Sequence, residues 1–298
     1  MPKFRRSHGS GQRKATDYLF SFAGFAEKSA KFRSRSSPRL KTHNSQLKTQ
    51  NSFLSQLNFS LSNTIILNKE FFFRFYMEKS SIFEVYEEKK GKNRFIYTKS
   101  LAPGTRVYDE NIKRKGATEY REWNPYKSKL GASIHKGAPN IFIRSGHIVL
   151  YLGASTGTTA SHVSDIVGEN GFVFALDSAP RVTRDLVFVC EERSNMAPLL
   201  EDAFHPENYK DKILPVDIVF QDIAQRNQLD IFLKNVNMFL KPGGYCILAV
   251  KSRSVDVTKK PKEIFGDVRE KLEKTVKIVD SRNLSPYQKD HMIFFCKK

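Results

Sequence analysis

Residues 148–159 read Ile-Val-Leu-Tyr-Leu-Gly-Ala-Ser-Thr-Gly-Thr-Thr, a short apolar run followed by a turn that contains two glycines. The apolar run predicts a parallel strand that is buried on both faces. Gly153 and Gly157 allow the backbone to turn tightly and to approach a ligand closely. Thr158 and Thr159 predict the first turn of a helix, whose free N–H groups bind polar ligands. The pattern is neither Gly-x-Gly-x-x-Gly nor a P-loop, so a cofactor loop and an ordinary strand-to-helix turn both remain open.

Length, charge and cysteine content narrow the class of protein. The chain has 298 residues, enough for one large domain or two modest ones. Its net charge of +19 predicts a polyanionic partner, most economically a nucleic acid. The three cysteines are scattered, without a Cys-x-x-Cys pair or a histidine at ligand spacing, so we expect a reducing compartment and no metal site. No apolar stretch reaches the roughly 18–20 residues of a membrane span, so no membrane partner is expected.

The first 76 residues differ from the rest of the chain. They contain 14 Lys and Arg residues but 3 Asp and Glu residues, which leaves +8 of the net charge on residues 77–298. Neither a helical period nor a strand-like alternation is long enough to predict an element, so we expect a disordered basic extension. Its origin has three alternatives: an RNA-binding arm, an organelle transit peptide, or upstream sequence translated from a start codon placed too early. The well-patterned sequence that begins at Met77 favours the last alternative.

The next segment, residues 77–120, is predicted to be a small antiparallel β domain. Residues 82–87 alternate between apolar and polar side chains, and residues 94–98 resume the alternation after a polar stretch with Gly91. This pattern is typical of a β-hairpin.

Residues 121–298 are predicted to form a second, larger domain. Asn124 and Pro125 predict the start of a helix over residues 125–136, with Asn124 as N-cap and Pro125 at the first helical position. Lys129 falls on this helix; an alternative is a linker helix whose lysines are simply solvated.

Strands and helices alternate through the remainder of the chain. Strands are predicted at 148–152, 172–176, 196–200, 216–220, 245–250, 276–280 and 291–296, and helices at 181–194, 226–240 and 262–274. The glycines of the Lys-Pro-Gly-Gly stretch at 241–244 predict the end of the second of these helices.

Polar residues follow several of these predicted strands. Four strands end at Gly153, Asp177, Asp222 and Lys251, and ligands of parallel α/β sheets bind outside the carboxyl ends of the strands. Asp177 comes 24 positions after Gly153, a distance at which an acidic residue accepts from the ribose of a bound nucleoside. An N-cap role for Asp177 is equally open. Asp202 follows the third strand, where it would face an adenine ring.

Five stretches of residues 77–298 then resemble one family in order and spacing. They are Glu-Trp-Asn-Pro with Ser-Lys-Leu at 122–130, Leu-Tyr-Leu-Gly-Ala with Gly-Thr-Thr-Ala-Ser-His-Val-Ser-Asp-Ile-Val-Gly at 150–168, Asp-Ile-Ala-Gln at 222–225, Lys-Ser-Arg-Ser-Val-Asp-Val-Thr-Lys at 251–259, and Pro-Tyr-Gln-Lys-Asp-His at 286–291. This part of the chain resembles fibrillarin, the S-adenosylmethionine-dependent RNA 2′-O-methyltransferase of box C/D ribonucleoproteins, especially in its archaeal form.

Two positions depart from the family's pattern. The family usually has Glu-Phe where this chain has Asp177 and Ser178, and an acidic residue where Gln221 stands. The first change keeps a ribose-binding carboxylate on a shorter arm and loses an aromatic ring that could flank the adenine. Residues 1–76 also lack the Gly/Arg-rich tract of eukaryotic fibrillarins, which favours an archaeal-type protein that begins at Met77.

The resemblance implies a fold class and a cofactor. The fold class is α/β, that of class I S-adenosylmethionine-dependent methyltransferases: a Rossmann-like, mostly parallel seven-stranded sheet with a small N-terminal antiparallel β domain. The cofactor is S-adenosyl-L-methionine. The residues implied to bind it are Gly153, Ala154, Thr158 and Thr159 for the methionine part, Asp177 for the ribose with Ser178 beside it, Asp202 and Ala203 for the adenine, and Asp222, Ile223, Ala224 and Gln225 for the far wall.

The resemblance also implies a catalytic set and a group of partners. Lys129, Asp222, Lys251 and His291 match the family's catalytic residues; we expect Lys251 to contact the ribose 2′-hydroxyl and Asp222 to orient that lysine. The implied partners are a box C/D guide RNA with its target ribosomal RNA, a Nop-type scaffold protein and a kink-turn-binding ribosomal-type protein, and transfer RNA is a further target. The protein would then work in the cytoplasm of an archaeal cell or the nucleolus of a eukaryotic one. A non-catalytic assembly subunit is the alternative function.

Overall fold

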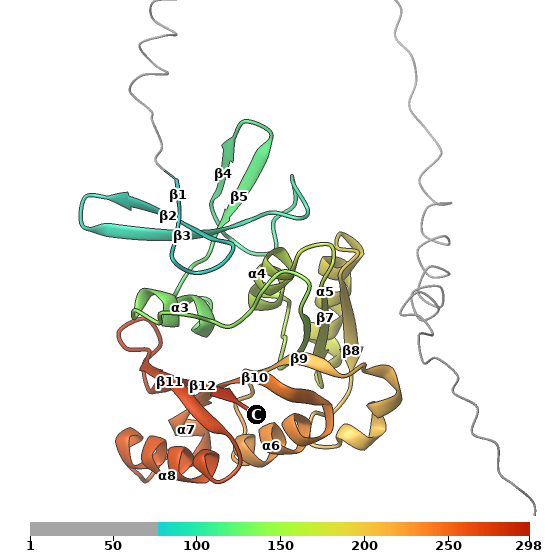
Figure 1. Ribbon diagram of the computed structural model, residues 1–298, viewed down its shortest axis with the longest axis vertical. Helices are drawn as coiled ribbons and strands as arrows, with labels where there is room; N and C mark the ends of the chain where they lie inside the picture. Colours follow the sequence, from blue (N-terminus) through green and yellow to red (C-terminus); the bar gives the residue numbers. More distant parts are fainter. Residues whose placement is uncertain (1–76) are drawn as a thin grey trace, which may run out of the picture. The chain divides into compact units, whose positions relative to one another are not determined.

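The computed structural model describes residues 77–298, and the expectations for residues 1–76 lie outside the described residues. The described part holds two β-sheets, a small antiparallel one and a seven-stranded one flanked by helices (Figure 1).

The small sheet contains five strands in the order β1-β2-β3-β5-β4, all antiparallel. The strands are β1 (Glu78–Lys79), β2 (Val85–Lys90), β3 (Asn93–Lys99), β4 (Ile112–Lys115) and β5 (Thr118–Glu122). The predicted hairpin corresponds to β2 and β3, and Gly91 in its turn has a φ of 58°. The strand predicted over residues 82–87 was placed too early, because residues 81–84 form a turn. The fifth strand also runs two residues past the predicted boundary at 120.

The helix predicted over residues 125–136 is shorter in the structure. Helix α3 spans Lys129–His135, and its N-cap is Ser128, whose Oγ accepts from the Gly131 N–H at 3.1 Å. Asn124 instead closes a turn, because its Oδ1 accepts from the Tyr126 N–H at 2.9 Å. The prediction of the helix start at Asn124 was therefore wrong, because its side chain caps a turn that ends before the helix begins.

The large sheet has the order β11-β12-β10-β9-β6-β7-β8. Its strands are β6 (Ile148–Leu152), β7 (Phe172–Asp177), β8 (Met196–Leu200), β9 (Val216–Gln221), β10 (Leu240–Lys251), β11 (Lys277–Asn283) and β12 (His291–Lys297). The first five are parallel, whereas β12 is antiparallel to its neighbours β10 and β11. The predicted mostly parallel seven-stranded sheet with a small antiparallel β domain is confirmed.

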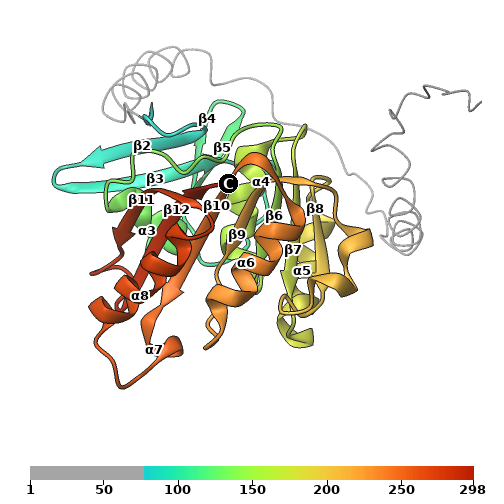
Figure 2. The same ribbon diagram turned by 60° about the horizontal axis from the view of Figure 1, so that its bottom comes forward.

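Helices cover both faces of the large sheet. They are α4 (Thr158–Val167), α5 (Pro180–Glu191), α6 (Gln228–Phe239), α7 (Ser252–Val255) and α8 (Pro261–Glu273), with single 3₁₀ turns at Pro206–Asn208 and Lys210–Lys212. Val149 and Tyr151 of β6 join a core cluster with α3, α4 and α5, while Leu150 and Leu152 join a second cluster with α6 and α8. Figure 2 shows α6 and α8 on their shared side of the sheet. Because both faces of β6 are buried, its sequence shows a continuous apolar run rather than an alternation.

Helix α6 ends at Phe239, one residue before the predicted end at 240, and the glycines that follow lie within β10. Leu240 and Tyr245 of β10 pair with β9 on either side of a register shift, and Gly243 between them has a φ of 77°. A Cβ at Gly244 would come within 3.0 Å of the Asp217 carbonyl oxygen. The glycines are therefore needed for a bulge that packs against β9.

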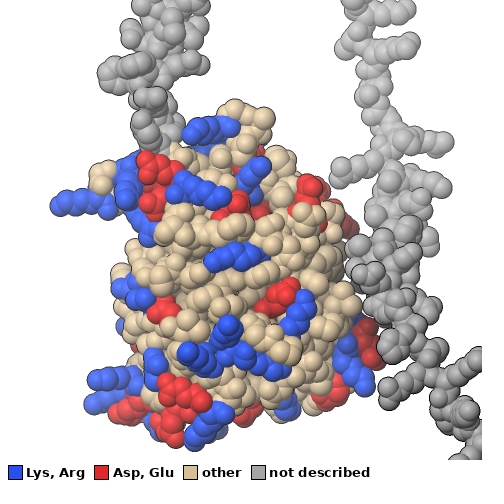
Figure 3. All heavy atoms as spheres, viewed as in Figure 1, with Lys and Arg blue, Asp and Glu red and all other residues tan. Residues whose placement is uncertain are grey.

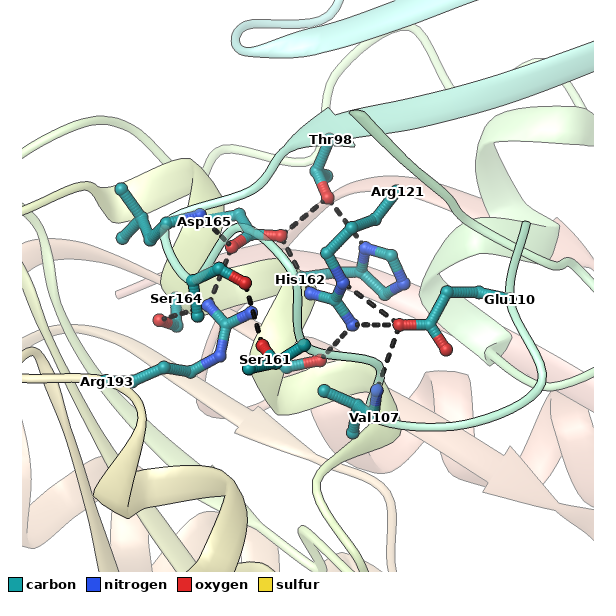
Figure 4. A network of polar contacts seen from close by, with 12 residues as sticks. Thr98, Val107, Glu110, Arg121, Ser161, His162, Ser164, Asp165 and Arg193 are labelled. Carbon is teal, nitrogen blue, oxygen red and sulfur yellow. Dashed lines mark hydrogen bonds and ion pairs between the residues drawn. The ribbon is translucent and has the colours of Figure 1, made fainter. Parts of the chain in front are cut away.

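A buried network of charges joins the small sheet to helix α4 (Figure 4). Arg121 of β5 is fully buried and donates to Glu110 and, at 2.8 Å, to Asp165 of α4. Asp165 also accepts from Arg193 at 2.6 Å and from the Thr98 hydroxyl at 2.8 Å. Each charge in the network faces an opposite charge, which offsets the cost of removing it from water.

His162 of α4 lies beside this network and contacts the small domain on both ring edges. Its Nδ1 lies 2.7 Å from Thr98 Oγ1, and its Nε2 lies 2.9 Å from the Tyr108 hydroxyl. The imidazole stacks on Trp123 at a centroid distance of 4.9 Å. Burial, with Arg121 nearby, holds the pKa of His162 well below its usual value, so the ring is neutral. Polar and stacking contacts thus fix the small sheet on α4.

The network predicts a large loss of stability when its central arginine is removed. Arg121→Ala should lower the free energy of unfolding by about 3–5 kcal/mol, because it leaves buried carboxylates uncompensated. Urea denaturation followed by circular dichroism measures this change. Arg184→Ala is the matched control, because Arg184 is an exposed arginine on α5 and should change stability by less than about 0.5 kcal/mol. Similar midpoints for both variants would contradict a structural role for the network.

Candidate active site

Three parallel strands end at one level. Leu152, the last residue of β6, stands in register with the residues of β7 and β9 that directly precede Asp177 and Asp222. Gly153, Asp177 and Asp222 therefore leave the sheet side by side at its carboxyl edge. The order of strands reverses between β6 and β9, and this is where ligands of such sheets bind.

The loops after β6 and β9 approach each other very closely. A Cβ on Gly153 would lie 2.5 Å from the carbonyl oxygen of Asp222, and the φ of Gly153 is 83°. The Asp222 N–H donates to the Leu152 carbonyl at 2.9 Å, and the N–H groups of Gly153 and Ala154 both donate to the Leu176 carbonyl. Only glycine fits at position 153, for steric and conformational reasons together.

Asp177 holds the loop after β6 in place. Its Oδ2 accepts from the Ser155 N–H at 2.8 Å, and its Oδ1 accepts from the N–H of Ala179, the N-cap residue of α5, at 3.0 Å. Each carboxylate oxygen keeps one lone pair for a ligand hydroxyl. Ser155 has a φ of 51°, a conformation that non-glycine residues seldom adopt. The sequence did not single out Ser155, because its N–H reaches Asp177 through this backbone conformation, which no sequence pattern predicts. Ser178 beside Asp177 is exposed.

The two threonines that begin α4 differ in what they can offer a ligand. Gly157 is the N-cap of α4 and provides no side-chain cap, so the N–H groups of the first turn remain for a ligand. Thr158 is partly exposed, whereas Thr159 is buried and its hydroxyl donates to Ser128 Oγ at 3.0 Å. Thr159 therefore links the glycine loop to the N-cap of α3, and only its backbone can face a cofactor.

The residues expected to line the adenine are held by one local hydrogen bond and one from helix α6. Asp202 is exposed and its Oδ1 accepts from the Phe204 N–H at 2.9 Å. Ala203 is buried, and its carbonyl accepts from Asn235 Nδ2 at 2.8 Å. On the other side of the edge, the turn between β9 and α6 contains Ile223, Ala224 and Gln225. These three residues are partly or fully exposed.

The four residues of the implied catalytic set come from four different elements. Lys129 at the start of α3 forms an ion pair with Asp222, with Nζ–Oδ distances of 2.8 and 3.0 Å. Lys251 ends β10, where it stands opposite His291, the first residue of β12. In the register of β9 and β10, Lys251 lies two residues beyond Asp222, which corresponds to about 6–7 Å along the strand. Lys251 is therefore displaced outward from the level of the glycine loop.

The partner of Asp222 differs from the one expected. Asp222 was expected to orient Lys251, but its carboxylate pairs with Lys129 in the structure. Within residues 77–298 the ammonium group of Lys251 forms no ion pair. Asp222 lies at the level of the β6 loop and α3 reaches that level, whereas Lys251 projects past it.

A buried glutamine that sequence reasoning missed holds the end of β10. Gln228 Nε2 donates to the Lys251 carbonyl and its Oε1 accepts from the Lys251 N–H, both at 3.3 Å. Gln221 in turn donates through its side-chain amide to the Gln228 carbonyl. A carboxylate at position 221 could not donate this hydrogen bond. The glutamine that replaces the family's acidic residue at this position therefore suits the Gln228 carbonyl, which needs a donor. The Gln228 amide takes the place of backbone hydrogen-bond partners that the end of β10 lacks. This role depends on the arrangement of the strands, so no sequence pattern around Gln228 predicts it.

Comparisons with known proteins show the family of this chain. Residues 77–298 match the model of the family described as Fibrillarin. The chain belongs to the fibrillarin family. It is 49% identical over 203 residues to the fibrillarin-like rRNA/tRNA 2′-O-methyltransferase of Pyrococcus horikoshii, an alignment that covers 68% of this chain and 89% of that protein. It is 50% identical over 199 residues to the protein of the same name from Methanococcus maripaludis (66% and 86%).

Solved fibrillarin structures share the fold. The Methanococcus jannaschii fibrillarin pre-rRNA processing protein superposes with a TM-score of 0.71 at 47% identity, covering 74% of this chain and 96% of that chain. Aeropyrum pernix fibrillarin, solved with natively bound S-adenosyl-L-methionine, gives 0.69 at 40% identity (74% and 97%). A fibrillarin in a fibrillarin/Nop5p complex gives 0.67 at 37% identity (73% and 99%). No helix within residues 77–298 has the length and apolarity to cross a membrane.

The pKa of His291 depends on burial and on the charges of Lys129, Asp222 and Lys251. Burial is the main cause that lowers its pKa below the ordinary 6.5, and Lys129 and Lys251 lower it further. The Lys289 carbonyl, which lies 2.6 Å from Nδ1, and the Asp222 carboxylate act in the opposite direction. His291 is therefore neutral at neutral pH. Because its pKa is lower in the folded than in the unfolded chain, its contribution to stability is complete above pH 6.5 and is lost as the pH falls through the folded pKa.

Opposite shifts of this pKa should follow from removing opposite charges. Lys251→Met should raise the pKa of His291, and Asp222→Asn should lower it, because the first removes a nearby cation and the second an anion. An NMR titration of the imidazole signals measures both changes. His147 is the internal control, since it precedes β6 at the opposite end of the sheet and should not respond. Shifts of His291 in one common direction would show that its pKa does not depend on these charges.

Proposed function

We propose that this fibrillarin transfers the methyl group of S-adenosyl-L-methionine to ribose 2′-hydroxyls of ribosomal RNA, and of transfer RNA, as the catalytic subunit of a box C/D ribonucleoprotein directed by a guide RNA. The observation that supports this most is the two-level arrangement of the sheet edge. Gly153, Asp177 and Asp222 lie at one level, while Lys251 and His291 stand beyond it. The lower level suits the cofactor, and the outer level suits an acceptor ribose.

The residues at the lower level fit S-adenosylmethionine. The first-turn N–H groups of α4 have no side-chain cap and would hold the methionine part, together with Gly153 and Ala154. The free lone pairs of Asp177 would accept the ribose hydroxyls, with Ser178 beside them. Asp202 and Ala203 would face the adenine, and the turn over residues 222–225 would form the far wall.

When bound, the cofactor supplies a methyl group already activated by its sulfonium. The chain must then place the 2′-hydroxyl in line and accept its proton. Lys251 would contact the hydroxyl, since it is the group that projects past the cofactor level without an ion-pair partner in residues 77–298. The Lys129–Asp222 pair and neutral His291 would hold the ribose and its phosphate. Proton-transfer help of this kind contributes about 10²–10⁴ in rate.

Substitution of Lys251 tests the chemistry. Lys251→Ala should lower single-turnover methyl transfer by about 10²–10⁴ while cofactor affinity stays near normal. Lys251→Arg should not restore the rate, because a guanidinium stays charged and does not share a proton. Asp222→Ala should reduce both cofactor affinity and rate, since it lies at the cofactor level and holds Lys129. The measurement is labelled methyl incorporation into guide-matched RNA by the assembled complex. A near-normal rate for Lys251→Ala would remove this lysine from the mechanism.

Substitution of Asp177 tests the cofactor site. Asp177→Ala should weaken S-adenosylmethionine binding by about 1–3 kcal/mol, the range for losing hydrogen bonds to a charged group. Asp185→Ala on α5 is the matched control, because Asp185 is half-exposed and lies outside the strand ends. Isothermal titration calorimetry compares the two variants. Unchanged affinity for Asp177→Ala would show that the ribose lies elsewhere.

The partners follow from the proposed reaction. A relative has been solved in a fibrillarin/Nop5p complex, which supports a Nop-type scaffold protein here. A guide RNA and a kink-turn-binding ribosomal-type protein would complete the complex. On the face shown in Figure 3, basic and acidic side chains are interspersed, so net charge alone does not locate the RNA surface. We propose that the complex works in the cytoplasm of an archaeal cell or the nucleolus of a eukaryotic one.

A non-catalytic assembly subunit is the second candidate function. It would keep the fold and the scaffold contact without needing a paired Lys129 and Asp222 at the strand edge. The same methyl-transfer assay separates the two functions. Assembly without methyl incorporation by the wild-type chain would support the second candidate.

A further inference from the structure

Tyr126 presents an exposed aromatic ring on a fixed backbone. Its side chain is 63% exposed, yet its N–H donates to Asn124 Oδ1 at 2.9 Å. Its carbonyl accepts from Gln288 Nε2 at 2.7 Å, and the same amide donates to the Pro125 carbonyl at 3.0 Å. A bulky ring is therefore held at the surface by three hydrogen bonds that all act on the surrounding backbone. Such an arrangement costs little ordering entropy when the ring contacts a ligand.

The ring lies where two loops enter the candidate active site. Tyr126 comes three residues before Lys129, which corresponds to at most about 11 Å of chain. Gln288 comes three residues before His291, and the ring of neighbouring Tyr287 meets Tyr126 edge-on at a centroid distance of 5.3 Å. Figure 1 shows α3 next to the loop between β11 and β12, as the Gln288 hydrogen bonds require. The two loops thus form one rim beside the catalytic set.

Two lysines, Lys127 and Lys289, lie on the same two loops. Lys289 is exposed, and within residues 77–298 its ammonium group forms no ion pair. Lys127, next to Tyr126, is half-exposed and pairs loosely with the exposed Asp109 at 3.7 Å. An exposed aromatic ring with lysines on the same loops is a combination that proteins use to bind an RNA strand, in which rings pack on nucleosides and cations bind phosphates.

We propose that Tyr126 packs against the nucleotide next to the methylated ribose in the acceptor RNA, and that Lys289 binds the adjoining phosphate. This inference rests on the proposed function, which places the reactive ribose at Lys251 and His291. A strand that enters there must continue over the neighbouring rim. Packing on a nucleoside face is independent of base identity, so the contact would position the strand without selecting a sequence.

Three variants test the contact in the assembled complex with full-length chain. Tyr126→Ala should raise the RNA concentration that gives half-maximal single-turnover methyl transfer by about 5- to 100-fold, because stacking on one nucleoside contributes roughly that factor. Tyr126→Phe should behave like wild type. Phe188→Ala is the matched control, since Phe188 is a 60% exposed aromatic on α5, and it should change nothing. Affinity for S-adenosylmethionine should be the same in all of them.

A second measurement does not depend on catalysis. RNA with 4-thiouridine next to the target nucleotide should cross-link on irradiation to the peptide that contains Tyr126. A wild-type RNA response from Tyr126→Ala, or cross-links only elsewhere, would overturn the inference. Weaker assembly of Tyr126→Ala with the scaffold protein, with an unchanged RNA response in the fraction that does assemble, would also overturn it, since the ring would then contact a protein. If the wild-type chain cross-links through Tyr126 but transfers no methyl group, the contact stands and the proposed reaction fails.

Discussion

The contact between Gly153 and Asp222 fixes the geometry of the whole strand edge. The Cβ of any other residue at position 153 would lie 2.5 Å from the carbonyl oxygen of Asp222, which is too close for two atoms that are not bonded. The loop after β6 and the loop after β9 are consequently joined, and Asp222 has its backbone against the glycine loop while its carboxylate faces Lys129. The glycine loop and the Lys129–Asp222 ion pair are therefore linked through one short stretch of backbone. A side chain at position 153 would separate them and disturb both at once.

The small sheet takes part in this geometry through helix α3. Trp123, just after β5, is fully buried and stacks on His162, and a Cβ on Gly131 of α3 would come within 3.0 Å of its ring. Ser128, which caps α3, also accepts from Thr159 of α4. The start of α3 is thus held between the small sheet and the first turn of α4. The buried charges around Asp165 fix the small sheet on α4 as well. The small domain therefore helps to determine where α3 begins, and with it the position of Lys129.

The sequence predicted those features that depend on local pattern. The run at 148–152 identified β6, because a strand buried on both faces needs apolar residues at every position. The same reasoning placed the strand ends at Asp177 and Lys251. The prediction of where α3 starts was wrong, because the sequence Asn124-Pro125 is typical of a turn as well as of a helix start.

Contacts between distant segments could not be predicted in this way. Thr159 was expected to bind the cofactor, but the hydroxyl of this residue donates to Ser128, which lies 31 residues away in sequence. The pairing of Asp222 with Lys129 spans 93 residues. Gln228 has no pattern that announces its role, since a buried glutamine on a helix is compatible with many partners. Such residues are found only when the register of the strands is known.

The early end of β9 explains why the edge has two levels. The pairing of β10 with β9 stops at Leu248, and the last residues of β10 continue with β12 on one side only. The Lys251 backbone groups on the open side are partly buried, and leaving them without partners would be costly. The Gln228 side chain fills this place, because its amide both donates to and accepts from the backbone of Lys251. If β9 ran further in the same register, its own backbone would pair with Lys251, and Asp222 would lie inside the strand, opposite Ala249. By stopping β9 at Gln221 and supporting β10 with a side chain, the fold releases Asp222 from the sheet at the level of the glycine loop and carries Lys251 further outward.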